Sequence, residues 1–247
     1  MKRFIEVHEI PNGAILLDTR SKAQYLAGHL RGARHGEFLE KFIIRNAEQL
    51  EFFHRALEAW VRSLGLIGHE HVVTYDSGRD TRASRAAWAL EYAGFRVQVL
   101  RQGLSGDVST EFPQISPSSF VLRPQRYLLA TVEQILAGGV LVLDTRDALE
   151  FSGQKLAPGA TRGGHIAGAQ NLDWQTLADE QGIKDAAALD ALLEKLPRDQ
   201  KIVVHCQSGA RSSVVYHALM ERGYDVANYL GSMNEWAADE NLPLEKS

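Results

Sequence analysis

The chain has 247 residues, of which 45% are hydrophobic and 23% charged, and its formal net charge is −4. This composition is typical of a globular protein with enough apolar residues for a core. Cations and anions are interspersed along the chain, which argues against nucleic acid or an anionic membrane as a partner, since either would favour a basic face.

The first ten residues, MKRFIEVHEI, contain two cations but no apolar stretch of signal-peptide length. No later run is apolar for long enough to cross a bilayer. The single cysteine cannot form an intramolecular disulfide. We therefore expect a cytoplasmic location.

The two halves of the chain resemble each other. Four segments recur in the same order: residues 14–20 (AILLDTR) as 140–146 (VLVLDTR), 29–33 (HLRGA) as 165–169 (HIAGA), 72–76 (VVTYD) as 202–206 (IVVHC), and 89–95 as 218–224. The period is too long for a solenoid repeat and indicates a duplicated domain.

The elements of each half alternate in type. Short apolar runs at 140–143, 202–205 and 226–230 have the length of buried strands. Residues 185–194 and 211–222 show helical periodicity, and Gly223 follows the second helix as a C′ residue. This alternation predicts an α/β fold with mainly parallel sheets flanked by helices on both faces.

A stretch rich in proline and serine separates the halves. Residues 107–125 contain three prolines among several serines and show little periodicity, as linkers do. We predict an N-terminal domain at 1–106, a linker at 107–125 and a C-terminal domain at 126–247.

The lone cysteine, Cys206, lies between a predicted strand and a predicted helix. The connection reads Cys206-Gln207-Ser208-Gly209-Ala210-Arg211-Ser212-Ser213. Such a turn presents backbone N–H groups and the positive end of a helix dipole to its first residue, and Gly209 permits positive φ. A thiol there should ionise below the free value of about 8.5. We predict that Cys206 is a catalytic nucleophile.

The other loop residues have predicted supporting roles. Gln207, Ser208, Gly209 and Ala210 are expected to act through their backbone N–H groups, and Arg211 is expected to bind an anion, such as a carboxylate or an oxyanion of sulfur. Ser212 caps the helix, with a hydroxyl able to reach the sulfur.

Several other polar residues are interpreted as structural. His205 alternates away from Cys206 on its strand, and an ionised thiol needs no base. The Asp-x-Arg motif occurs in both halves, as Asp18/Arg20 and Asp144/Arg146, which favours a buried ion pair that supports folding. The same interpretation applies to His165. Histidine and cysteine show no metal-ligand spacing, so neither a metal nor a cofactor is expected.

In these motifs the sequence resembles the tandem-domain rhodaneses, sulfurtransferases that act on thiosulfate or 3-mercaptopyruvate. Both halves carry Asp-x-Arg and His-x-x-Gly-Ala, and the second half adds the cysteine loop and Gly231-Ser232-Met233-Asn234-Glu235-Trp236. The resemblance implies an inactive first domain, with Asp76 in place of the cysteine. It also implies transfer of sulfur through a persulfide of Cys206, from a small anionic donor to cyanide or a thiol. The cation at Arg211 favours thiosulfate.

One residue departs from the family pattern. Relatives often have a donor-binding arginine in the helix after Asp-x-Arg, whereas this sequence has Glu150 at that place. An unpaired carboxylate would repel an anionic donor. Arg162, in an insertion that the first half lacks, is a candidate to compensate.

Two alternative functions are open at this point. A persulfide carrier without small-donor turnover would use the same cysteine. A cysteine phosphatase is the second alternative, but it needs arginine six positions after the cysteine, where this chain has Ser212.

Overall fold

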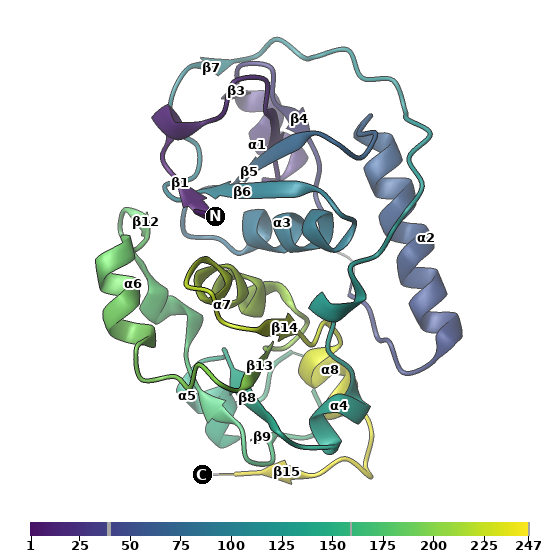
Figure 1. Cartoon of the computed structure of the whole chain (residues 1–247), viewed down its shortest axis with the longest axis vertical. Helices are drawn as coiled ribbons and strands as arrows, with labels where there is room; N and C mark the ends of the chain where they lie inside the picture. Colours follow the sequence, from purple (N-terminus) through teal and green to yellow (C-terminus); the bar gives the residue numbers. More distant parts are fainter. Residues whose placement is uncertain (39–40, 159, 247) are drawn as a thin grey trace. The chain divides into compact units, whose positions relative to one another are not determined.

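The computed structural model describes residues 1–38, 41–158 and 160–246. The chain divides into two compact units: unit 1 comprises Met1–Glu40, Glu51–Arg126 and Ala178–Lys184, and unit 2 comprises Lys41–Leu50, Tyr127–Leu177 and Asp185–Ser247. Figure 1 shows the course of the chain. Residues 107–125, which include the predicted linker, thus cluster with unit 1.

Unit 1 is built on a five-stranded parallel sheet. Its strand order is β1-β6-β5-β2-β4, from Phe4–Ile5, Arg96–Leu100, His71–Tyr75, Ile15–Asp18 and Arg34–His35. A short antiparallel pair joins β3 (His29–Leu30) to β7 (Val108–Ser109). Val108 and Ser109, in the predicted linker, are therefore strand residues of unit 1.

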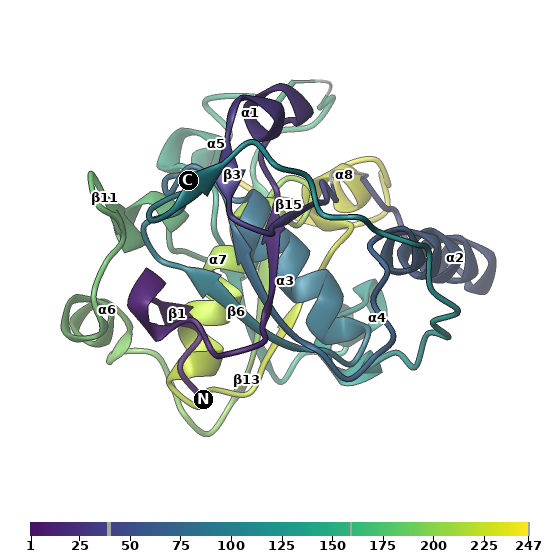
Figure 2. The same cartoon turned by 90° about the horizontal axis from the view of Figure 1, so that it is seen from above.

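The helices of unit 1 are α1 (Lys22–Ala27), α2 (Ala47–Ser63) and α3 (Arg82–Tyr92), with a 3₁₀ turn, η1, at Val7–Glu9. Helix α3 connects β5 to β6 and packs against both strands. Seen from above, it runs alongside β6 (Figure 2).

Unit 2 repeats this plan with a four-stranded parallel sheet. Its order is β10-β8-β13-β14, from Gln170–Asn171, Val140–Asp144, Lys201–His205 and Val226–Asn228. Leu129 adds a parallel bridge to Asn228, at the place that β1 occupies in unit 1. The three predicted strands of this half are confirmed, with the third ending at Asn228.

The helices of unit 2 are α4 (Val132–Leu136), α5 (Ala148–Ser152), α6 (Ala186–Leu193), α7 (Ala210–Glu221) and α8 (Ser232–Trp236), with 3₁₀ turns η2 at Arg126–Leu128 and η3 at Trp174–Leu177. Its remaining short strands, β9 (His165–Ile166) and β15 (Leu244–Glu245), pair with each other. The pair β11 (Ala178–Asp179) and β12 (Gly182–Ile183) lies in the segment that clusters with unit 1. Asp185 caps α6, and Gly223 follows α7 with φ 77°, so both predicted helices are confirmed.

Each unit has its own apolar core against its sheet. In unit 2, Val142 and Val203 pack with Tyr229, Met233 and Trp236. This cluster fixes the segment that follows β14 against the strand that leads to the cysteine.

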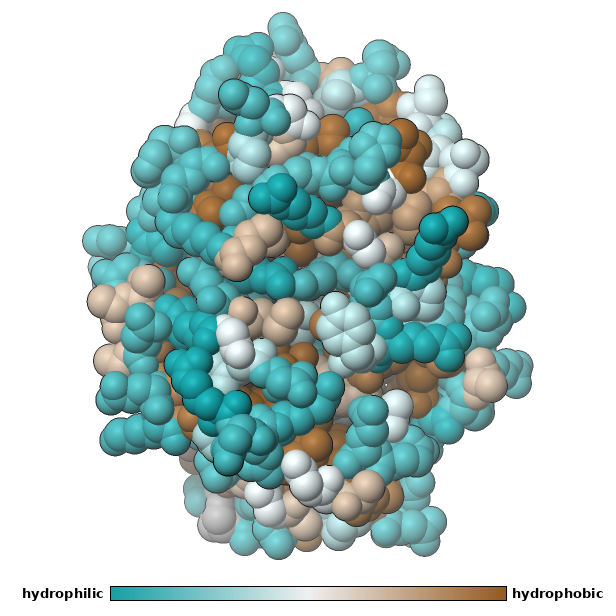
Figure 3. Space-filling view, in the orientation of Figure 1, coloured by the Kyte–Doolittle hydropathy of each residue, from teal (hydrophilic) through white to brown (hydrophobic). Residues whose placement is uncertain are grey.

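Hydrophilic residues predominate on the face shown in Figure 3, where hydrophobic residues occur in small groups. In the part of the chain that the structure describes, no helix combines the length and apolar character that a membrane crossing demands.

Candidate active site

Cys206 lies at the carboxyl end of β13, immediately before the tight turn into α7. Only 1% of its surface is exposed. Open parallel sheets bind their ligands at the carboxyl ends of strands, where the chain crosses to a helix. The cysteine therefore stands where this fold class places its chemistry.

Backbone N–H groups of the loop surround the sulfur. The N–H of Gly209 donates to Cys206 Sγ at 3.2 Å, and the backbone N–H groups of Ser208 and Ser212 also donate to it. Gly209 adopts φ 83°, and a Cβ built on it would lie 2.6 Å from Leu230 Cδ1. Only glycine suits this position, because any side chain would meet both a strained φ and a steric clash.

The segment 231–236 holds the loop's other polar groups. Met233 N donates to Cys206 O at 3.2 Å, Asn234 N donates to Gln207 O at 2.9 Å, and Cys206 N donates to Ser232 Oγ at 3.2 Å. With its carbonyls held there, the loop turns its N–H groups towards the sulfur. Ser232 adopts φ 52°, a strained conformation for a residue with a side chain.

A buried network underlies the start of α7. Ser212 Oγ lies 3.7 Å from Cys206 Sγ and donates to Asn228 Oδ1 at 2.8 Å. Asn228 Nδ2 donates to Ser213 Oγ, which donates to Gly209 O at 2.7 Å. This chain of hydrogen bonds links β14 to the residue whose N–H faces the sulfur. The N-cap residue of α7 is Gly209, without a side-chain cap bond, and Ser212 lies inside the helix, so the predicted capping role of Ser212 is wrong.

Arg211 and Glu150 form a two-point ion pair. Arg211 Nη1 lies 2.5 Å from Glu150 Oε2, and Nη2 lies 3.0 Å from Oε1. The side chains are 24% and 5% exposed, respectively. The carboxylate at the usual position of a donor-binding arginine is therefore paired, and its partner is the cation that we expected to bind the donor.

The thiol of Cys206 is activated electrostatically. Burial alone would raise its pKa, but the positive charge of Arg211, the backbone N–H groups of Ser212 and Ser208 and the Ser212 hydroxyl together hold the pKa below its ordinary value. The thiolate fraction at a given pH is therefore higher than in a free cysteine, without a neighbouring base.

A pocket of about 270 Å³ adjoins the loop within unit 2. Its polar lining includes Gln207 and Asn234, joined by a 2.7 Å hydrogen bond, together with Thr161 and Lys41. Met233 and Ile43 contribute apolar surface. Of the loop residues predicted as site residues, Gln207 is the one that lines this pocket.

The Asp-x-Arg motifs form the predicted buried ion pairs. Arg146 Nη2 lies 2.6 Å from Asp144 Oδ2 and 2.7 Å from Gly164 O; Arg20 makes the same contacts with Asp18 and Gly28 O, both at 2.6 Å. Each arginine thereby ties the Asp-x-Arg strand of its unit to the glycine that precedes the histidine of the repeated His-x-x-Gly-Ala segment.

The two histidines interpreted as structural have no contact with the sulfur among the described interactions. His165 stacks on Phe151 at 3.7 Å and bonds Phe151 O through Nδ1. His205 is fully buried, with Nε2 3.8 Å from Asp144 Oδ2, and burial lowers its pKa.

Arg162 does not supply the compensating cation suggested by the sequence. Its guanidinium donates to Asp239 O at 2.5 Å and to Leu242 O at 2.9 Å. It anchors the C-terminal segment of unit 2, a contact that its position in an inserted loop did not reveal.

Asp76 occupies the corresponding place in unit 1. It follows β5, and its carboxylate accepts N–H bonds from Gly78 at 2.8 Å and from Ala83 at 2.9 Å. Burial raises its pKa to about 6. The carboxylate therefore occupies the position that the thiol has in unit 2.

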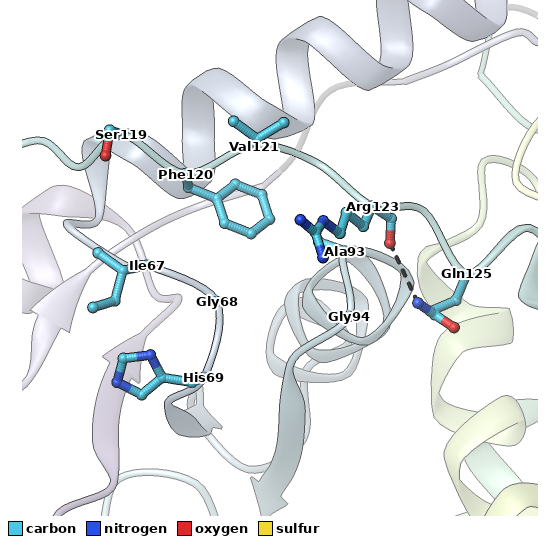
Figure 4. Close-up of a pocket in the computed structure, with 10 residues that line it drawn as sticks. All are labelled: Ile67, Gly68, His69, Ala93, Gly94, Ser119, Phe120, Val121, Arg123 and Gln125. Atoms are coloured by element: carbon cyan, nitrogen blue, oxygen red, sulfur yellow. Dashed lines mark hydrogen bonds between the residues drawn. The ribbon is translucent and has the colours of Figure 1, made fainter.

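A second pocket, of about 480 Å³, lies in unit 1 (Figure 4). Its lining comes from residues 67–69, 93–94, 119–121, 123 and 125, with the ring of Phe120 and the side chain of Arg123 drawn beside it. Residues 67–69 precede β5 and residues 93–94 precede β6, so this pocket lies at the amino ends of the strands, away from Asp76. It is not the counterpart of the cysteine site.

Within residues 1–38, 41–158 and 160–246, no group of three or more His, Cys, Asp or Glu residues is placed to hold a metal ion.

A model of the rhodanese-like domain matches the sequence twice, over residues 5–109 and 129–239. This chain belongs to the rhodanese family. It is 30% identical to a thiosulfate sulfurtransferase of Azotobacter vinelandii, covering 94% of this chain and 90% of the relative. It is also 30% identical to the 3-mercaptopyruvate sulfurtransferase of Escherichia coli K12, covering 92% and 87%.

Solved structures agree with this family. A crystal structure of a "Probable Thiosulfate Sulfurtransferase" has 34% sequence identity and a TM-score of 0.81, covering 96% of this chain and 99% of that one. The tandem rhodanese fold and the class of sulfurtransferase enzyme expected from the sequence are thereby confirmed.

The sequence alone indicated no role at the site for Asn228 or Lys41, and Ser232 appeared there only as part of the motif at 231–236. Asn228 and Ser232 organise the loop, and Lys41 lines the adjoining pocket. A signal existed for Asn228, a polar residue in an otherwise apolar run. Lys41 comes from a segment in the first half of the sequence, and no local pattern indicates that it lies in unit 2.

Proposed function

We propose that this rhodanese carries sulfane sulfur as a persulfide on Cys206, taking it from a small anionic donor, with thiosulfate preferred, and passing it to cyanide or a thiol. The observation that carries the proposal is the buried sulfur at the end of β13, facing N–H donors with Gly209 N at 3.2 Å. Such donors stabilise negative charge on sulfur both before and after loading.

The first half-reaction loads the cysteine. The Cys206 thiolate attacks the outer sulfur of thiosulfate, a bond forms between the two sulfurs, and the S–S bond of thiosulfate breaks. Sulfite leaves with the electron pair of that bond, and the enzyme holds Cys–S–S⁻.

The second half-reaction empties it. Cyanide attacks the outer sulfur of the persulfide, thiocyanate leaves, and the electron pair of the broken bond restores the thiolate. A thiolate acceptor would leave as a persulfide by the same route. Each step is a nucleophilic displacement at sulfur that moves one electron pair, so the proposed cycle uses no cofactor and no metal.

The residues of the loop have different roles in this proposal. The N–H groups of Gln207, Ser208, Gly209 and Ala210 form the cradle for the charged sulfur, and Ser212 adds a hydroxyl at 3.7 Å. Arg211 lowers the pKa of the thiol and attracts the donor anion. Lys41 and Gln207 line the pocket through which a small donor would approach.

The proposed inactive state of the N-terminal domain follows from Asp76. A carboxylate already ionises and accepts the loop N–H bonds, but it does not form a persulfide. The proposed domain boundaries, 1–106 and 126–247 around a linker at 107–125, and a cytoplasmic location remain predictions, testable by limited proteolysis and by cell fractionation.

The test is turnover of thiosulfate and cyanide to thiocyanate by purified protein, with 3-mercaptopyruvate as the competing donor. Cys206→Ser and Cys206→Ala should both lose all turnover while melting cooperatively like the wild type. Residual thiocyanate formation above a few per cent in either variant would overturn the proposal. Persulfide on Cys206 from cells, without turnover of either donor, would favour a carrier instead.

A further inference from the structure

Glu150 forms an ion pair with Arg211, the residue whose positive charge acts on the Cys206 thiol. Both carboxylate oxygens of Glu150 accept from Arg211, at 2.5 and 3.0 Å. The guanidinium fork suits a carboxylate or a sulfur oxyanion equally, because both present two oxygens at the same spacing. A donor anion and Glu150 would therefore use the same N–H groups.

The carboxylate of Glu150 is not needed to build its helix. Asp147 caps α5 by accepting from the backbone N–H of Glu150 at 2.9 Å, and Lys155 pairs with Asp147 at 2.7 Å. Both carboxylate oxygens of Glu150 accept hydrogen bonds from Arg211 instead. The Arg211 side chain is 24% exposed, so solvent and small solutes reach its guanidinium.

The acid is confined to the half with the cysteine. Counting six residues from the aspartate of Asp-x-Arg leads to Glu150 in unit 2 and to Gln24 in unit 1. Gln24 serves its own helix in a capping box with Ser21. A neutral side chain is thus compatible with this position of the fold.

We propose that Glu150 is a specificity-determining residue that competes with the donor anion for Arg211. The inference rests on the proposed function in one respect, that the donor reacts at Cys206. A dianionic donor must displace the carboxylate to reach the cation, whereas an uncharged reagent reaches the sulfur without that cost. Glu150 therefore sets the affinity for anionic donors without touching the reacting sulfur.

The first test measures how strongly the site favours an anionic reagent over a neutral one, and it does not depend on sulfur transfer. Cys206 is alkylated with iodoacetate, an anion, and with iodoacetamide, its neutral analogue, and the ratio of the two rates is taken. Glu150→Gln should raise this ratio about tenfold, the effect of one charge-assisted hydrogen bond made available. Glu150→Ala should raise it likewise, which covers the case in which the first variant fails to fold.

The matched control is Asp147→Asn, which removes one negative charge from the same helix turn and keeps an N-cap side chain. Its ratio should stay within about twofold of the wild type. An equal rise in this variant would mean that net charge, not competition, governs the site, and it would overturn the inference. Adding Arg211→Ala to Glu150→Gln should abolish the gain, as competition for that residue requires.

The second test uses turnover. In Glu150→Gln the KM for thiosulfate should fall about tenfold with kcat within about threefold of wild type, because ground-state binding of the anion is what changes. A ratio and a KM that both stay unchanged in the folded variants would overturn the inference. A changed alkylation ratio in a protein that transfers no sulfur would instead overturn the proposed function and keep the competition.

Discussion

Asp76 and Cys206 occupy the same position in two equivalent loops, with a carboxylate in unit 1 and a thiol in unit 2. Each residue follows the strand paired to the Asp-x-Arg strand of its unit, and each accepts backbone N–H bonds from its own loop: Asp76 from Gly78 and Ala83, and Cys206 from Gly209. The duplicated fold thus directs backbone N–H groups at the same position twice and has a nucleophile in one copy.

The buried carboxylate of unit 1 predicts a pH dependence of stability. The pKa of Asp76 is raised to about 6 from 3.8, so its contribution to folding is fully present below the unfolded pKa and is lost as the pH rises through 6. Relative to Asp76→Asn, the wild type should lose about 2 kcal/mol of unfolding free energy between about pH 4.5 and about pH 7. Urea unfolding of the wild type and of Asp76→Asn at several pH values measures this loss. A difference in unfolding free energy that does not change with pH would contradict the raised pKa.

The lowered pKa of Cys206 predicts a reactive thiol at neutral pH. The midpoint of the pH profile for alkylation by iodoacetamide should lie below that of a free thiol. Arg211→Ala should move the midpoint upward, because the charge of Arg211 is one cause of the shift. A wild-type midpoint at or above the free value would show that burial outweighs the donors of the loop.

Gly209 should not tolerate a side chain. Gly209→Ala places a Cβ 2.6 Å from Leu230 Cδ1 at a residue with φ 83°. We expect a loss of about 1–3 kcal/mol in unfolding free energy and a fall of about 10- to 100-fold in kcat, because the N–H at the sulfur is displaced.

Gly223→Ala is the matched control for that variant. Gly223 has φ 77° but nothing within 4 Å of a built Cβ. Gly223→Ala should therefore lower the unfolding free energy through the strain of a positive φ, and it should leave kcat unchanged. Equal losses of kcat in the two alanine variants would show that the loop geometry at the sulfur does not matter.

Much of this structure could be predicted from the sequence because its signals are local. The runs at 140–143 and 202–205 are buried strands, and the repeat of Asp-x-Arg gave the two ion pairs. The repeat also identified Asp76 as the counterpart of Cys206.

The contacts of the charged residues could not be predicted in the same way. The sequence places Glu150 and Arg211 some sixty positions apart, and no periodicity indicates that they bind each other. Arg162 was a candidate cation for the site, yet it bonds carbonyls of the C-terminal segment. Pairing of long side chains depends on the packing of whole elements, which one sequence does not record.

Intact mass spectrometry of the purified protein tests the central claim, a persulfide on Cys206, most directly. After incubation with thiosulfate, the wild type should gain the mass of one sulfur atom and lose it again on addition of cyanide. Cys206→Ser should show no gain. A wild type that stays unmodified by both thiosulfate and 3-mercaptopyruvate, or a cyanide-labile sulfur on Cys206→Ser, would contradict the account.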